Sequence, residues 1–391
     1  MTILALETSC DDTCAAVIGE HGEIRSNVIS SQRAHDRFGG VVPEIASRHH
    51  LELVNLIVER SLAEADVTLD GIDLVAVTQG PGLVGALLVG LSTAKALAAA
   101  RKLPLAAVDH LQGHVAANFL VSDADHASKD AGVAADGAAV ENDGVAAVVD
   151  GGVAGDGGVA ESDADRARDS AHEAFEPPFL CLIASGGHTL LAHVRDHTGF
   201  ETLGRTLDDA AGEAFDKGAR MLGLGYPGGP ALERLAAEGN PEAFEFPASG
   251  SRSRGGRGAT RAFGRGLDFS FAGVKTSLLY RLRELGETQA RERAADLAAS
   301  YQAAIVSHLM LRTEQALESS GLDRLAVGGG VAANGELRRR LQELGASVHM
   351  PPRILCTDNA AMIGGAARYM SALPYPKYLS LDAYATGERP R

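Results

Sequence analysis

The sequence predicts an α/β protein built from two related halves. Short apolar segments typical of strands alternate with helical patterns, as expected when helices cover a largely parallel sheet. A strand, turn, strand, hairpin, strand pattern opens the chain at residues 2–29 and recurs at residues 179–203. Such a recurrence indicates an internal structural duplication. With 391 residues, the chain is long enough for two domains, each with its own core.

The composition indicates a cytoplasmic protein. Hydrophobic residues make up 45% of the chain, and no apolar run has membrane-spanning length. The first residues read as a strand and lack the basic segment of a signal peptide. The four cysteines do not follow a zinc-ribbon spacing, so we expect reduced thiols. They are Cys10, Cys14, Cys181 and Cys356.

The first half begins with two apolar strands at residues 2–6 and 14–18, separated by a polar turn at residues 7–13. A turn rich in hydroxyl groups and backbone N–H groups between two strands can hold a phosphate. Asp11 and Asp12 could meet a metal ion or a polarised water there, or they could simply be solvated acids.

A long amphipathic helix is predicted at residues 51–65, followed by a buried strand at 72–78. Its apolar face is predicted to hold Leu51, Val54, Leu56, Ile57, Leu62 and Ala63. A glycine turn at 80–85 then leads into a helix at 86–100, whose small residues suit close packing on a sheet.

Residues 103–120 concentrate the chemistry of the first half. A short buried strand is predicted to end at Asp109, with a helix after it. His110 and His114 are four residues apart, so on a helix they share one face and could bind one divalent metal ion. In open α/β sheets, ligands bind at the carboxyl ends of strands, which favours this interpretation. A pair of structural histidines remains the alternative.

An acidic, low-complexity segment at residues 121–175 interrupts the pattern. It holds 13 Asp and Glu against 3 Lys and Arg, so −10 of the net charge of −15 lies there. The segment has no steady helical or strand period, and we expect a disordered surface insertion.

The opening pattern then returns, with strands predicted at residues 179–184, 190–194 and 200–203 and a turn at 185–189. A helix is expected to start at Asp208, with acids in its first turn. A rigid glycine–proline turn is expected further along, at 226–230.

The remaining chain holds a cationic loop, helices and a second glycine turn. The loop at 249–266 is rich in Arg and Gly, and helices are expected from 276 to about 320. Residues 325–334 read as a strand, a glycine turn and a helix start, which would let backbone approach a nucleotide closely. Asp358 stands at a predicted helix N-terminus, where either it or Thr357 could be the N-cap.

Ten motifs in one order closely resemble the TsaD family of bacterial tRNA N6-adenosine threonylcarbamoyltransferases. They are ETSCD at 7–11, GVVPEIASR at 40–48, GPGL at 80–83, HLQGH at 110–114, SGGHT at 185–189, DDAAGEAFDK at 208–217, YPGGP at 226–230, FSFAGVK at 269–275, GGGVAAN at 328–334 and TDN at 357–359. The resemblance covers nearly the whole chain apart from 121–175 and 249–266.

The resemblance implies duplicated actin/Hsp70/sugar-kinase-like domains around a central cleft. We expect the first domain at 1–120, the insertion at 121–175, the second domain at 176–372 and a tail at 373–391. The implied reaction is transfer of threonylcarbamoyl from threonylcarbamoyl-AMP to N6 of adenosine 37, in tRNAs that read codons beginning with A.

The family's site residues carry over to matching positions of this sequence. A metal site is implied at His110, His114 and Asp358, holding one Fe²⁺ per subunit, with Zn²⁺ or another divalent ion also possible. No covalent nucleophile is implied. Adenylate-binding positions are implied at Ile183, Ala184, Ser185, Gly186, Gly187, Asp216, Gly229 and Asn334. The implied partners are the tRNA and proteins like TsaB and TsaE, with a TsaC-type enzyme supplying the adenylate and no membrane involved.

Three positions depart from the usual bacterial pattern. Gln112 and Asp12 each stand where Glu is usual, and Ala184 stands where Val is usual. The strand around Ile183 offers no Tyr of the kind that archaeal and eukaryotic relatives often use as a further metal ligand, so the bacterial branch is favoured.

Three other functions remain as alternatives. The main one is an ATP-dependent kinase or ATPase of the same fold, which would not need the two histidines. A metallopeptidase is weakened by Leu111, because a HExxH site requires Glu directly after the first histidine. A non-catalytic scaffold would not need intact metal ligands.

Overall fold

The computed structural model describes residues 1–121, 175–247 and 266–385, which fold into two compact units. Unit 1 comprises Met1–Ala34, Val41–Phe175 and Asp358–Arg391, and unit 2 comprises His35–Gly40 and Glu176–Thr357. The two segments interpreted above as an acidic insertion and a cationic loop lie almost entirely outside the described residues.

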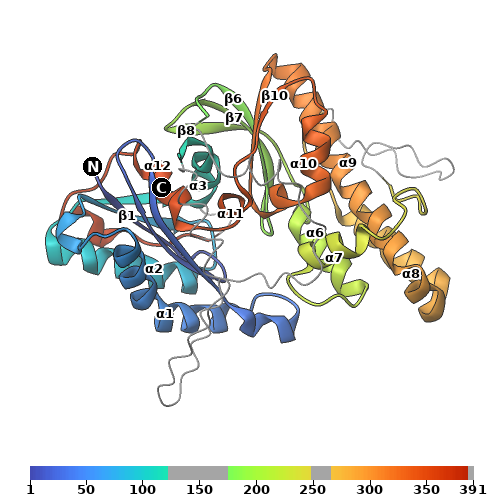
Figure 1. The fold of residues 1–391 in the computed structure, drawn as a ribbon, viewed down its shortest axis with the longest axis horizontal. Helices are drawn as coiled ribbons and strands as arrows, with labels where there is room; N and C mark the ends of the chain where they lie inside the picture. The colour runs from blue at the N-terminus through green and yellow to red at the C-terminus, as the bar shows by residue number, and fades with distance from the viewer. Residues whose placement is uncertain (122–174, 248–265, 386–391) are drawn as a thin grey trace. The chain divides into compact units, whose positions relative to one another are not determined.

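Unit 1 contains a mixed five-stranded sheet with the order β3-β2-β1-β4-β5. Its strands are β1 (Ile3–Glu7), β2 (Asp12–Ile18), β3 (Ile24–Ser31), β4 (Leu74–Gly80) and β5 (Leu105–Asp109). The strands β1, β2 and β3 pair antiparallel, whereas β4 pairs parallel to both β1 and β5. Strand β1 is completely buried because helices cover both faces of this sheet (Figure 1).

Unit 2 repeats this sheet. Its strands are β6 (Phe179–Ala184), β7 (Thr189–Asp196), β8 (Gly199–Arg205), β9 (Arg324–Gly328) and β10 (Ser347–His349). Their order is β10-β9-β6-β7-β8, with the first three in sequence pairing antiparallel and β9 pairing parallel to both β6 and β10. Order and direction therefore match those of the first sheet. The duplication and the actin/Hsp70/sugar-kinase-like α/β class are confirmed.

Helix α1 (Pro43–Glu64) begins eight residues before the start predicted from sequence. The first turn accepts Pro43 because the missing N–H would have no partner within the helix. The predicted apolar face is also partly wrong, since Leu51 and Leu56 are 69% and 54% exposed. The buried face instead runs through Ala46, His50, Val54, Ile57, Val58, Ser61 and Leu62.

Helix α2 (Val84–Arg101) packs against α1 and β4. Its length and composition alone would allow it to cross a membrane. Of this helix 33% is buried, and its buried side chains, among them Ala86, Leu87 and Leu91, lie inside unit 1.

Two short helices complete the part of unit 1 that matters for the site. Helix α3 (His110–Ala116) follows β5 directly, and α12 (Ala360–Ala367) packs against α3 and the sheet. A Cβ on Gly364 would lie 2.5 Å from Ile18 Cγ1, so this glycine permits the close approach of α12 to the strands. This packing places residues 358–372 with unit 1, whereas the sequence analysis assigned them to the second domain.

The helices of unit 2 share one hydrophobic core with its sheet. They are α6 (Ala211–Met221), α7 (Gly228–Ala236), α8 (Ala272–Glu292), α9 (Ala294–Ser320), α10 (Gly335–Gln342) and α11 (Arg353–Cys356). Helix α6 starts three residues after the predicted Asp208, and α7 begins within the predicted glycine–proline turn. Short 3₁₀ helices occur at Arg33–Phe38, Leu69–Gly71, Ala117–Phe119, Gly330–Ala333 and Lys377–Ser380.

Candidate functional site

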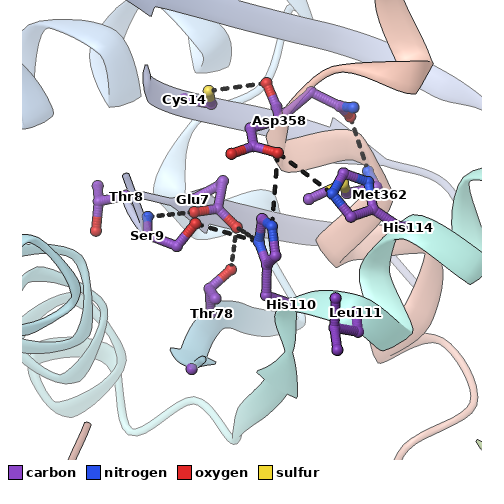
Figure 2. A network of polar contacts seen from close by, with 12 residues as sticks. Glu7, Thr8, Ser9, Cys14, Thr78, His110, Leu111, His114, Asp358 and Met362 are labelled. Carbon is purple, nitrogen blue, oxygen red and sulfur yellow. Dashed lines mark hydrogen bonds and ion pairs between the residues drawn. The ribbon is translucent and has the colours of Figure 1, made fainter. Parts of the chain in front are cut away.

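Three side chains of unit 1 converge on a common point, as the sequence predicted. Nε2 of His110 lies 3.5 Å from Asp358 Oδ1, and Nε2 of His114 lies 3.3 Å from the same oxygen. All three candidate ligand atoms lie within 4.8 Å of one another (Figure 2). The two imidazole rings meet edge to face, with their centroids 4.7 Å apart. Residues more than 240 positions apart in sequence thus form one cluster.

The N-cap residues of two helices orient these side chains. Asp109 caps α3, because its Oδ1 accepts hydrogen bonds from the backbone N–H groups of Leu111 and Gln112. The cap of α12 is Asn359, which accepts from Met362 N at 2.9 Å. The alternative that Asp358 or Thr357 serves as the cap is therefore wrong. Because Asn359 performs that role, the Asp358 carboxylate can face the histidines.

Gly113, between the two histidines, lets α3 pack closely against α12. A Cβ at this position would lie 2.8 Å from Ile363 Cδ1 and 3.2 Å from Met362 Cγ. The helix that carries both histidines therefore approaches the N-terminal turn that follows Asp358. Sequence reasoning did not assign Gly113 this role, although it stands inside the HLQGH motif.

Glu7, at the end of β1, contacts Nδ1 of His110, whereas Asp358 lies near Nε2 (Figure 2). Its Oε2 lies 3.0 Å from His110 Nδ1 and accepts a 2.6 Å hydrogen bond from the Thr78 hydroxyl. Its Oε1 accepts from the backbone N–H of Ser9. A carboxylate can only accept, so Nδ1 of His110 must donate and carries the hydrogen. In the neutral imidazole the lone pair then belongs to Nε2, the nitrogen nearer Asp358.

The charges around the cluster give the two histidines different proton affinities. Burial alone would lower the pKa of His110, but the carboxylates of Asp358 and Glu7 outweigh burial and raise it to about 9. Burial lowers the pKa of His114, and Asp358 offsets this only in part. Without a metal, the proton therefore resides on His110, while His114 is neutral.

The donor set fits a divalent metal ion. His114 is fully buried, and neither of its ring nitrogens has a hydrogen-bond partner among the described residues. A buried polar atom of this kind is costly unless a ligand satisfies it. Two imidazoles and one carboxylate suit first-row divalent metals, and the Glu7–His110 contact resembles the carboxylate–histidine pairs that orient metal ligands.

Asp11 and Asp12, the other candidate metal-binding acids, are not part of this three-residue group. Burial, the charges of Asp11 and Asp358, and to a lesser extent Glu7, raise the pKa of Asp12 to about 8. Asp12 is therefore mostly protonated at neutral pH in the absence of a metal.

The candidate adenylate-binding positions all lie in unit 2, and several of them form one turn. Strand β6 ends at Ala184, and Ser185 closes a tight turn, with its N–H donating to His188 O at 2.8 Å. Gly186 and Gly187 are exposed, and a Cβ added to either would meet no atom within 4 Å. Packing does not explain these glycines, whereas the close approach of a ligand to backbone would.

The parallel neighbour β9 ends beside this turn, and α6 packs on it. Ile183 pairs with Gly328, and Gly329 has a φ of +86° and packs against Ala184. The N–H of Gly212, in the first turn of α6, donates to Ser185 O at 3.1 Å. The predicted turn after β6 and the glycine turn after β9 are thus brought together.

Asp216 and Asn334 have structural partners of their own. Asp216 Oδ1 accepts from Gly228 N at 2.9 Å, which anchors the start of α7 next to Gly229. Asn334 caps α10 by accepting from Leu337 N at 3.0 Å, and its amide donates to Gln302 at 2.9 Å. A substitution at either position would therefore alter local structure as well as any ligand contact.

Asp209 connects acidic and basic residues of two sequence motifs in unit 2 through ion pairs. It forms ion pairs with Lys217, at 2.9 Å, and with Lys275. Although burial opposes it, the two lysines hold the pKa of Asp209 below its usual range. These contacts connect α6 with α8, and no functional role had been assigned to them from sequence.

Comparisons with known proteins agree with these features. A sequence profile of TsaD, described as tRNA N6-adenosine threonylcarbamoyltransferase, matches residues 23–139 and 161–365. A protein of that description from Clostridium botulinum strain 657 is 42% identical over 374 residues, covering 94% of this chain and 92% of the relative. Another from Clostridium perfringens strain ATCC 13124 is 43% identical over 386 residues, covering 97% of this chain and 96% of the relative.

Solved structures match with low sequence identity. Component A of (R)-2-hydroxyglutaryl-CoA dehydratase from Acidaminococcus fermentans is 13% identical, with a TM-score of 0.48, over 97% of this chain and 100% of its own. Full-length HypF is 14% identical, with a TM-score of 0.49, over 98% of this chain and 56% of its own. The fold assignment above therefore rests on the two sheets themselves.

Proposed function

Because this chain belongs to the TsaD family of tRNA N6-adenosine threonylcarbamoyltransferases, we propose that His110, His114 and Asp358 hold one Fe²⁺ ion per subunit for this reaction. The chain is accordingly an acyltransferase that acts on tRNA, and the kinase or ATPase alternative is not favoured. The metal, its identity, the donor and the partners are the proposed parts.

One observation supports the metal most directly: three candidate ligand atoms lie close together at His114, which is fully buried. Its Nε2 lies 3.3 Å from Asp358 Oδ1, and neither ring nitrogen forms a hydrogen bond among the described residues, so a cation at this point would satisfy both the imidazole and the carboxylate. With three protein ligands, coordination positions remain for substrate oxygens. A divalent ion held there would act as a Lewis acid toward those oxygens.

We propose threonylcarbamoyl-AMP as the donor and adenosine 37 as the acceptor. The bond between N6 and the carbamoyl carbon forms, the bond between that carbon and the phosphate oxygen breaks, N6 loses a proton and AMP leaves. The donor is already activated, so no covalent nucleophile from the protein is needed. The protein has to position the donor and stabilise charge as AMP leaves.

The turn after β6 supports an adenylate site in unit 2. Gly186 and Gly187, which follow Ser185, leave backbone accessible at the carboxyl end of a strand, where ligands of α/β sheets bind. Backbone N–H groups of such turns can bind phosphate. Asp216 and Asn334 would act beside them, Asp216 by holding the start of α7 at Gly229.

The proposed setting is the cytoplasm, with partners similar to TsaB and TsaE and a TsaC-type enzyme that supplies the adenylate. These proposals derive from the family alone.

The test is to incubate the purified chain with its partner proteins, threonylcarbamoyl-AMP and unmodified tRNA, and to measure the modified nucleoside after digestion of the tRNA. We expect product in the presence of metal, and little product for His114→Ala, which should keep its fold while losing metal. Full metal occupancy of His114→Ala, measured by elemental analysis, would overturn the metal assignment. Release of inorganic phosphate from ATP without modified nucleoside would favour the ATPase alternative.

A further inference from the structure

The C-terminal segment of unit 1 returns to the sheet that carries the metal site. Leu373 forms two backbone hydrogen bonds with Leu105 at the edge strand β5, of 2.8 and 3.0 Å. Tyr378 is fully buried in the core, and Lys95 of α2 donates to the carbonyl of Leu379 at 3.2 Å. The chain is thus held on unit 1 well beyond its last α-helix.

Residues 381–385, which we call the strap, continue to the carboxyl ends of β4 and β5. Gln79 of β4 donates from Nε2 to Asp382 O at 2.8 Å, and Tyr384 N donates to Gln79 O at 3.3 Å. The Tyr384 ring lies against Gly80, where an added Cβ would come within 2.9 Å of two ring atoms. Gly80 therefore leaves the space that the tyrosine occupies.

The Tyr384 hydroxyl connects the strap to the helix that carries the histidines. It lies 2.8 Å from Asp109 Oδ2 and 2.8 Å from Gly80 O, and its single hydrogen can be donated to either. Asp109 uses its other oxygen, Oδ1, to cap α3. One carboxylate thereby joins Tyr384 to the first turn of α3, next to His110.

From this geometry we propose that Tyr384 is a positioning residue for the metal site. The strap fixes the Asp109 carboxylate, Asp109 fixes the start of α3, and α3 fixes the directions of His110 and His114. The proposal rests on the metal site proposed above. Mutation of a group that orients a metal ligand commonly lowers metal affinity by about 10- to 100-fold. Because Tyr384 acts through a helix cap, its loss should have a smaller effect, about three- to tenfold.

The experiment compares Tyr384→Phe with Tyr378→Phe in the full chain. Tyr384→Phe keeps the ring but removes the hydroxyl that faces Asp109. Tyr378→Phe is the matched control, because the buried Tyr378 hydroxyl has no hydrogen-bond partner among the described residues. Metal affinity is measured by titration with Co²⁺ followed by its visible absorption. Amide hydrogen exchange at Leu111 and Gln112 is measured on metal-free protein.

We expect Tyr384→Phe to bind Co²⁺ about three- to tenfold more weakly and to exchange faster at Leu111 and Gln112, while Tyr378→Phe matches the wild type in both. Wild-type affinity and exchange in Tyr384→Phe would overturn the proposal, as would equal losses in both variants. If the wild type binds no Co²⁺, the metal site itself is refuted, and exchange at the two amides still decides whether the strap orders α3.

Discussion

Nδ1 of His110 donates a hydrogen bond to the Glu7 carboxylate, 3.0 Å away, and this contact determines which nitrogen of His110 faces Asp358. Because Nδ1 carries a hydrogen, loss of the second proton of His110 leaves the lone pair on Nε2, toward the other two candidate ligands. A histidine that binds a metal through Nε2 needs this neutral tautomer, so the extra proton of metal-free His110 has to leave when a metal binds. Glu7 would thus select the candidate ligand atom although it contributes no atom to the three-residue group.

Glu7→Gln should weaken metal binding by about tenfold or more, because a neutral amide supports the imidazole less strongly and can present the wrong group to it. Co²⁺ titration of the metal-free protein is the measurement. Thr78→Val is the control, since it removes one hydrogen bond to Glu7 and leaves the contact with His110 in place. An unchanged affinity in Glu7→Gln would show that the carboxylate does not tune the site.

The candidate ligands could be predicted from the sequence, whereas the residues that support them could not. His110 and His114 are separated by one helical turn, so local spacing alone placed them on one face, and the motif resemblance added Asp358. Glu7 contacts His110, 103 residues later in the chain, and Tyr384 contacts Asp109, 275 residues earlier. Only the tertiary fold brings these residues together. No local periodicity carries that information.

Asn334 should affect AMP binding through its amide and stability through its helix cap. Asn334→Ala removes both, whereas Asn334→Ser keeps a cap but is too short to reach Gln302. We expect both variants to bind AMP more weakly in calorimetric titration. Only the alanine variant should lose about 1 kcal/mol of unfolding free energy. AMP affinity equal to that of the wild type in both would place the nucleotide elsewhere.

The strands were predicted more closely than the helix boundaries. Strand β6 matches its prediction at both ends, because six consecutive buried residues give a clear apolar run. Helix α1 was mispredicted because its start at Pro43 resembles a loop, and because Leu51 and Leu56 face solvent while His50 and Ser61 are buried. The buried polar pair is stabilised by Thr13 and Ser26, on strands distant in sequence.

The arginines of residues 249–266 lie outside the described structure, and their predicted role rests on charge. Replacing them by Ser should flatten the salt dependence of tRNA binding by about two to four log units per log unit of salt, because each phosphate contact releases counterions. The changed residues are Arg252, Arg254, Arg257, Arg261 and Arg265. Turnover at saturating tRNA should persist. Binding measured over a salt series, with partner proteins present, is the check, and an identical slope would reduce the stretch to a linker.

His308 should make unit 2 less stable in acid. It is fully buried beside the stacked rings of Phe269 and Phe271, with ring centroids 5.7 and 5.0 Å away. Burial, assisted by the charge of Arg312, lowers its pKa from 6.5 to about 4. His308 therefore becomes protonated below about pH 6.5 in the unfolded chain but only below about pH 4 in the folded chain. Because the unfolded state binds more protons between these values, the free energy of unfolding falls as the pH decreases across this window.

His308→Leu removes this proton uptake. Relative to the variant, the wild type should lose up to about 1.4 kcal/mol of unfolding free energy per pH unit between pH 6.5 and 4, and no more below that. Urea unfolding across the window measures the difference. Phe271→Leu serves as the control, because it disturbs the same cluster without a titratable group and should keep the wild-type slope. If His308→Leu kept that slope as well, protonation of other groups would have to explain the acid sensitivity.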